Sequence, residues 1–131
     1  MKIKRIKYKR INSNFLPIIK IKIVGPKKTK VVDAILDTGA STTTISPELC
    51  EELGLKKIAE TPVATASTTE IVGLYKSKII FVGIPFEIYI ANCKIPKEHP
   101  VRILVGRDLM AFFKITFDGI RAIIEIKSDL F

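Results

Sequence analysis

This 131-residue chain has no tryptophan, no glutamine, one histidine and two cysteines. His99 stands alone, and Cys50 and Cys93 lie far apart without the spacing of a metal site, so we expect no bound metal and no cofactor. The two thiols are expected to stay unpaired, as in a reducing compartment. The lack of glutamine, together with much Ile and Lys, is typical of proteins from hot-growing organisms.

Long apolar runs are also missing. A membrane helix needs roughly 18 uninterrupted apolar residues. The richest stretch, residues 79–91, is interrupted by Gly83, Pro85 and Glu87. No apolar segment follows the basic N-terminus, so we expect no signal peptide, no membrane contact and a cytoplasmic protein.

Acidic residues are absent from the first 30 positions, which carry 11 of the 22 Lys and Arg residues. The remainder holds 11 bases and all 13 acids, a net charge of −2. Residues 1–14 are interpreted as a basic arm and residues 15–131 as a single domain. The arm indicates either a solvated strand or a contact with nucleic acid or another anionic surface. We favour the strand, because Lys20 and Lys22 further along alternate with isoleucines.

The chain has the short apolar segments and turn residues of an all-β protein with one or two short helices. Strands are predicted at residues 5–11, 15–24, 31–36, 42–45, 78–82, 86–91, 101–105, 114–117 and 120–126, and strand character resumes from residue 71 onward. A projecting hairpin is predicted around residues 61–69, which are small and polar.

Helix signals occur at two places. Ser46 is a good N-cap, Pro47 suits the first helical position and Gly54 suits the end, so a helix is predicted over residues 47–53. A second short helix is predicted over residues 109–113.

An apolar strand ends in Asp37-Thr38-Gly39, which occurs once in the chain. Such a strand projects a carboxylate into a turn, and glycine lets another backbone approach closely. Two carboxylates held a few Å apart share one proton and can divide acid and base roles. By itself the tripeptide also fits a surface turn in which Asp37 caps a backbone N–H.

A second segment, residues 103–109, supplies another apolar strand followed by Gly106, Arg107 and Asp108. In this order and spacing, the two segments resemble the retropepsin-like aspartic proteases. The resemblance covers about residues 15–126 and implies the closed β-barrel of an acid-protease half-domain. It implies a homodimer that hydrolyses polypeptides, with Asp37 of each chain as the catalytic acid.

The resemblance also implies roles for neighbouring residues. Thr38 and Gly39 would support the active-site loop, with the Thr38 hydroxyl bonded across the dimer. Gly106, Arg107 and Asp108 would be structural. Substrate contacts are implied for Gly39, Ala40 and Ser41 in the loop, and for Ala66, Ser67 and Thr68 in the flap that covers the site.

This sequence departs from the family pattern in three places. Ser41 stands where the retroviral enzymes have an acid, so Arg107 must find another partner. The flap segment, residues 64–70, contains no glycine, although such flaps usually turn on one. The basic arm has no clear counterpart.

Two other functions stay open. A non-catalytic relative could bind peptides as a dimer, which the altered flap and Ser41 would fit. A basic nucleic-acid-binding β-domain is less favoured, because only Tyr8 among exposed-type aromatics lies in the arm.

Overall fold

The computed structural model describes residues 2–64 and 67–131. The described elements are β1 (Lys2–Lys7), β2 (Lys9–Ile11), β3 (Asn14–Leu16), β4 (Ile18–Val24), β5 (Thr29–Leu36), β6 (Thr44–Ile45), α1 (Pro47–Leu53), β7 (Lys56–Ala64), β8 (Thr69–Phe81), β9 (Ile84–Asn92), β10 (Ile103–Val105), α2 (Arg107–Met110), β11 (Lys114–Asp118) and β12 (Ile123–Ser128). The predicted class, mostly strand with two short helices, is confirmed.

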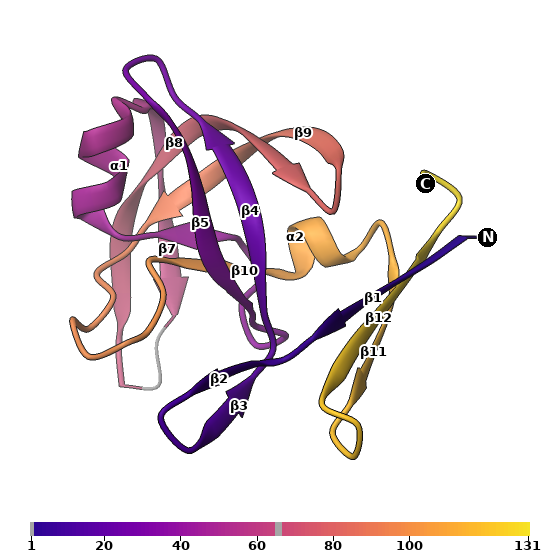
Figure 1. The fold of residues 1–131 in the computed structure, drawn as a ribbon. Helices are drawn as coiled ribbons and strands as arrows, with labels where there is room; N and C mark the ends of the chain where they lie inside the picture. Colours follow the sequence, from indigo (N-terminus) through magenta and orange to yellow (C-terminus); the bar gives the residue numbers. More distant parts are fainter. Residues whose placement is uncertain (1, 65–66) are drawn as a thin grey trace.

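Six strands form a closed barrel in the order β4-β5-β10-β6-β9-β8 (Figure 1). The barrel closes because β4 pairs with β8 as well as with β5. Strand β10 runs parallel to β5 and antiparallel to β6, so it lies between segments distant from it in sequence. Strand β7 extends from the barrel as the partner of β8. The closed barrel expected from the sequence is therefore present.

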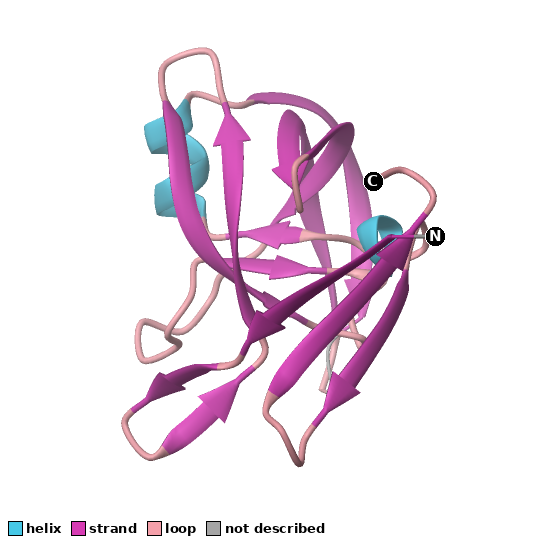
Figure 2. Cartoon of the chain, turned by 45° about the vertical axis from the view of Figure 1, so that its right-hand side comes forward, coloured by secondary structure: helices cyan, strands magenta, loops and turns pink. Residues whose placement is uncertain are grey.

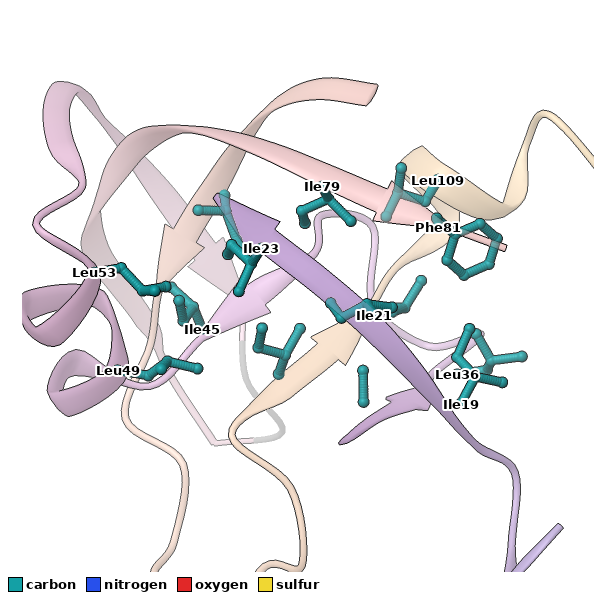
Figure 3. Close-up of a cluster of buried hydrophobic side chains, with 14 of the residues drawn as sticks. Ile19, Ile21, Ile23, Leu36, Ile45, Leu49, Leu53, Ile79, Phe81 and Leu109 are labelled. Carbon is teal, nitrogen blue, oxygen red and sulfur yellow. The ribbon is translucent and has the colours of Figure 1, made fainter. Parts of the chain in front are cut away.

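The core fills the barrel interior (Figure 3). In β4, Ile19, Ile21 and Ile23 are buried while the lysines between them are exposed, as a half-buried strand requires. Leu49 and Leu53 bring one face of α1 onto the same core. Each fully buried aliphatic side chain contributes about 1.5–3 kcal/mol relative to exposure.

Helix α1 has the bounds that its end signals predict. The Ser46 side chain accepts a hydrogen bond from the Leu49 N–H, and Pro47 opens the helix. Gly54 ends it with φ 69°, a left-handed conformation that favours glycine.

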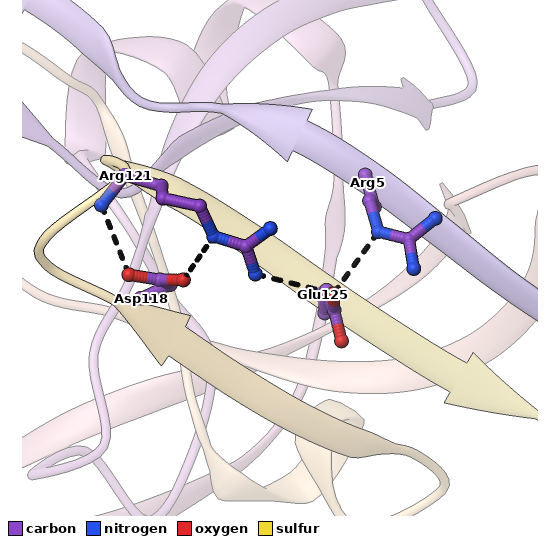
Figure 4. A network of polar contacts seen from close by, with 4 residues as sticks. All are labelled: Arg5, Asp118, Arg121 and Glu125. Atoms are coloured by element: carbon purple, nitrogen blue, oxygen red, sulfur yellow. Dashed lines mark hydrogen bonds and ion pairs between the residues drawn. The ribbon is translucent and has the colours of Figure 1, made fainter.

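A second layer consists of the three-stranded sheet β1-β12-β11, which stands beside the barrel (Figure 2). One face carries an ion-pair network: Arg121 binds Asp118 and reaches Glu125, which also accepts a hydrogen bond from Arg5 Nε at 3.0 Å (Figure 4). These groups join all three strands at a largely exposed surface. The network fixes strand register more than it adds stability.

The N-terminal strands differ from those predicted. The segment 5–11 was expected to be one strand but divides at Tyr8, whose N–H bonds to the Ala122 carbonyl. The segment 15–24 divides at Pro17, which has no N–H to donate to a ladder. As a result β1 joins β12, while β2 and β3 form a separate hairpin.

The boundaries of β8 and α2 also differ from the predicted ones. Strand β8 begins at Thr69 and continues without a break to Phe81, longer than predicted. Helix α2 begins at Arg107, directly after Gly106, rather than at residue 109 as predicted. No helix of the described residues is long and apolar enough to cross a membrane.

Candidate active site

Asp37 follows β5 at the point where this strand leaves the barrel. Its N–H donates to the Val105 carbonyl at 2.9 Å, which ties the loop to β10. Its Oδ1 accepts a hydrogen bond from the Gly39 N–H at 3.0 Å, and its carbonyl accepts one from the Ala40 N–H at 3.1 Å. These three bonds fix both the backbone and the carboxylate of Asp37.

Gly39 lies close to that carboxylate. A Cβ atom at this position would lie 3.2 Å from Asp37 Oδ1, a tight contact. The backbone here has ordinary φ, so the glycine is used for close approach and not for an unusual turn. Thr38 and Gly39 are exposed at the end of the loop.

Arg107 supports the same loop from the start of α2. Its backbone N–H donates to the Ala40 carbonyl at 2.8 Å, and its Nη1 donates to the Thr38 carbonyl at 2.7 Å. Because Ser41 replaces the acid of the retroviral enzymes, Arg107 needs another partner. In this chain that partner is the backbone carbonyl of Thr38.

Gly106 lets α2 pack against the chain that follows the loop. It is buried, and a Cβ there would lie 2.7 Å from the carbonyl carbon of Thr42 and 2.9 Å from the Thr43 nitrogen. No side chain fits between these two backbones.

A partly buried hydrogen-bond network behind the loop centres on Thr43. Its hydroxyl donates to Asp108 Oδ1 at 2.7 Å and accepts from the Gly106 N–H at 3.1 Å. Its N–H donates to Asp108 Oδ2 at 3.0 Å, and Asp108 Oδ1 also accepts from the Leu109 N–H. Thr43 itself is fully buried. Sequence reasoning missed it, because a threonine within a strand-like run carries no sign of a partner 65 residues away.

A cleft of about 610 Å³ opens in front of Asp37. One wall is the loop, the second is the end of β7, and the third is the segment after β9. The lining residues are Asp37, Gly39, Ala40, Ser41, Thr42, Thr44, Thr61, Pro62, Val63, Ala64, Cys93, Lys94, Ile95, Leu104 and Arg107.

The structure brings together only some of the residues singled out in the sequence. Around Asp37, the cleft is lined by the predicted residues Gly39, Ala40, Ser41 and Arg107. Gly106 and Asp108 lie behind the loop, where both contact Thr43; their structural role stays a prediction. The hairpin positions Ser67 and Thr68 are exposed in the turn between β7 and β8 and do not line this cleft, whereas Ala66 lies outside the described residues.

Sequence reasoning did not find the third wall, which contains Cys93, Lys94 and Ile95. Burial raises the pKa of the Cys93 thiol, and the Glu70 carboxylate raises it further. The other thiol, Cys50, is buried outside the cleft, and burial raises its pKa to about 11. Both cysteines are free in the structure.

Residues 19–109, more than half of the chain, match the sequence profile of a family described as aspartyl protease. The chain belongs to the aspartyl protease family. Both the Asp37 loop and the segment from β10 to Asp108 lie inside the matched region, and the basic arm lies outside it.

Solved structures of aspartyl proteases share this fold. The EIAV protease, solved in complex with the inhibitor HBY-793, has a TM-score of 0.58 and 18% identity over 78% of this chain and 91% of that one. A retropepsin-like aspartic protease from Rickettsia conorii has a TM-score of 0.58 and 16% identity over 95% and 91%. No curated protein sequence gives a significant match. At these identities the likeness establishes the retropepsin-like fold that the sequence predicted. The predicted membership of an aspartyl protease family is confirmed by the profile match.

Proposed function

We propose that this aspartyl protease-family chain is an endopeptidase that hydrolyses peptide bonds in extended polypeptide segments. The observation that supports this is the placement of Asp37, which lines a cleft of about 610 Å³ and has its backbone and carboxylate fixed by hydrogen bonds. The support of the loop by Arg107 and Gly106 adds the rigidity that a catalytic carboxylate needs.

The proposed chemistry needs a second copy, because each chain carries a single Asp37-Thr38-Gly39. Two Asp37 carboxylates a few Å apart share one proton. The ionised carboxylate accepts a proton from a water molecule, whose oxygen attacks the peptide carbonyl carbon. The protonated carboxyl group donates a hydrogen bond to the carbonyl oxygen and stabilises the charge that develops there.

The β7–β8 hairpin would hold the substrate. Residues 61–64 of β7 form one wall of the cleft opposite the loop. An extended peptide that lies between β7 and the Asp37 loop can form hydrogen bonds like an added strand. This kind of binding recognises the peptide's backbone more than its side-chain sequence. Substrate contacts by Ser41, Ser67 and Thr68 remain predictions.

Cleavage of an unfolded polypeptide, measured from about pH 3 to pH 7, tests this function. We expect a rate maximum within this range, because the pair must hold one proton and the rate falls when it holds none or two. Absence of cleavage at every pH would contradict the endopeptidase proposal. Peptide binding without cleavage would favour the non-catalytic peptide-binding relative.

Strand β11 provides a suitable surface for the second copy. In the sheet β1-β12-β11, only β1 and β11 have an edge that no strand of the described residues pairs. The β1 edge carries four basic residues within six positions, which repel a like strand. The sequence of β11, Lys-Ile-Thr-Phe-Asp, is self-complementary when two copies pair antiparallel about Thr116. Lys114 then faces the second copy's Asp118, which opposite charges favour.

This arrangement predicts the effect of charge changes on β11. Lys114→Asp places two acids opposite each other at both ends of the proposed pair, and Asp118→Lys places two bases there. Each variant alone is expected to dimerise roughly tenfold more weakly than the wild type. An equimolar mixture of the two variants is expected to recover dimers, because both cross-strand pairs become attractive again.

Analytical ultracentrifugation of the single variants and of their mixture measures this. Lys22→Asp, on β4 and outside this sheet, has the same charge change as Lys114→Asp and should leave the dimer unchanged. If Lys114→Asp dimerises like the wild type, or the mixture gives no recovery, β11 is not the contact.

A further inference from the structure

The charges that surround the cleft are unbalanced. Among its lining residues, Asp37 is the only acid, whereas Lys94 and Arg107 are both cations and both exposed. In the proposed dimer the two Asp37 side chains hold one proton between them, so the pair carries a single negative charge. Glu70, on β8, is a further acid near the cleft, since its carboxylate raises the pKa of the Cys93 thiol. Two copies of Lys94 and Arg107 carry more positive charge than the Asp37 pair and two copies of Glu70 carry negative charge.

Neither cation is neutralised by the described part of the chain. Lys94 has no ion pair there, and Arg107 donates to the Thr38 carbonyl, a neutral acceptor. Asp108 follows Arg107 directly, but its carboxylate accepts hydrogen bonds from Thr43 and Leu109 behind the loop. A cation that faces a cleft without an internal partner is available to a ligand carboxylate.

The segment that carries Lys94 is held in place. Cys93 donates its N–H to the Ile45 carbonyl at 3.0 Å. Arg102 donates to the carbonyls of Ile95, Pro96 and His99, with distances of 3.3, 2.8 and 2.7 Å. Arg102 braces this loop, and Lys97 in the same loop does not line the cleft, so Lys94 is the loop's cation that a ligand in the cleft can contact.

The remaining lining combines apolar and hydroxyl side chains. Val63, Ile95 and Leu104 supply the apolar part, next to Lys94 and Arg107. The net charge of +9 comes from the first 30 residues, whereas residues 31–131, which include the whole cleft lining, carry a net charge of −2. The positive charge at the cleft is therefore local and comes from Lys94 and Arg107.

We propose that the cleft selects acidic polypeptide segments, in which Glu or Asp side chains flank the apolar residues that occupy the pocket. Lys94 is the specificity-determining residue, since it places a positive charge beside the apolar wall. This inference rests on the proposed endopeptidase function for its biological meaning, but it concerns binding and can be tested without cleavage.

The test uses three fluorescein-labelled peptides that share a central apolar pair flanked on both sides by Glu, by Gln or by Lys. Their dissociation constants are measured by fluorescence anisotropy on the wild type and on Asp37→Asn, which cannot process them if the proposed function is right. We expect the Glu peptide to bind about three- to tenfold more tightly than the Lys peptide, with Gln between them. The difference should shrink as salt is added.

Lys94→Glu is expected to reverse the order of the Glu and Lys peptides. Lys22→Glu makes the same change in net charge outside the cleft and should keep the wild-type order. Equal affinity for the three peptides, or an order that Lys94→Glu leaves unchanged, would overturn the proposal. Selective binding without cleavage would leave this inference standing and contradict the proposed endopeptidase instead.

Discussion

Asp37→Asn is expected to abolish peptide cleavage, with a rate at least about a thousandfold below that of the wild type. An amide can neither accept the proton of the attacking water nor share a proton with its partner. In a homodimer the substitution removes both carboxylates, so no residual acid–base pair remains. The measurement is the initial rate of cleavage of an unfolded reporter polypeptide at the pH optimum.

The fold should survive this substitution. The Asn side chain is nearly the same size, and its Oδ1 can still accept the hydrogen bond from the Gly39 N–H. We therefore expect the free energy of unfolding to change by less than about 1 kcal/mol. A loss of activity together with an unchanged melting curve would assign the effect to chemistry.

Asp33→Asn is the matched control. Asp33 lies on β5, four residues before Asp37, and makes ion pairs with Lys9 and Lys20 outside the cleft. The hydrogen bond from Lys9, with help from Lys20, lowers the pKa of Asp33. Losing these largely exposed pairs should cost little stability and no cleavage. Cleavage by Asp37→Asn at the wild-type rate, or equal loss in Asp33→Asn, would contradict a catalytic role for Asp37.

Thr43→Val is expected to lower the free energy of unfolding by about 2–4 kcal/mol. Valine fills nearly the same volume, so the substitution removes a hydroxyl without leaving a cavity. Asp108 loses a partly buried hydrogen bond of 2.7 Å, and the Gly106 N–H loses its acceptor in a buried hydrogen bond. Urea unfolding at a fixed protein concentration measures the change, because a dimer's stability depends on concentration.

Thr44→Val provides a control at the next position. Thr44 is also buried, but its hydroxyl has no hydrogen-bond partner among the described residues. Replacing this hydroxyl with a methyl group is expected to leave stability unchanged or to raise it by about 1 kcal/mol. If the two variants lose similar stability, the cost at Thr43 reflects valine itself and not the network with Asp108.

Local sequence signals predicted several elements correctly. The alternation of Ile and Lys in β4 gives a strand with one buried face, because side chains alternate along a strand. The bounds of α1 follow from Ser46, Pro47 and Gly54, whose capping geometry depends only on the nearest turn. The apolar strand before Asp37 and the glycine after it gave the position of the loop.

Strand boundaries near the termini depended on partners far along the chain. Residues 5–11 have a continuous alternating pattern, yet the segment divides at Tyr8 because β1 pairs with β12 and β2 pairs with β3. Helix α2 begins at Arg107 because this residue donates hydrogen bonds to the Asp37 loop. Helix propensities depend on neighbouring residues and do not predict such a long-range contact.

The sequence by itself determined the strand content, helix α1, the candidate catalytic carboxylate of Asp37 and the aspartyl protease family. The elements depend on residues adjacent in the chain, and the family depends on the order of two motifs, Asp37-Thr38-Gly39 and residues 103–109. Only the tertiary structure decided what surrounds Asp37. The walls of the cleft come from β7 and from the segment with Lys94, and these meet the loop only after β4 closes the barrel on β8. The partnership of Thr43 with Asp108 is decided in the same way, since a hydrogen bond across 65 residues exists only when the chain is folded.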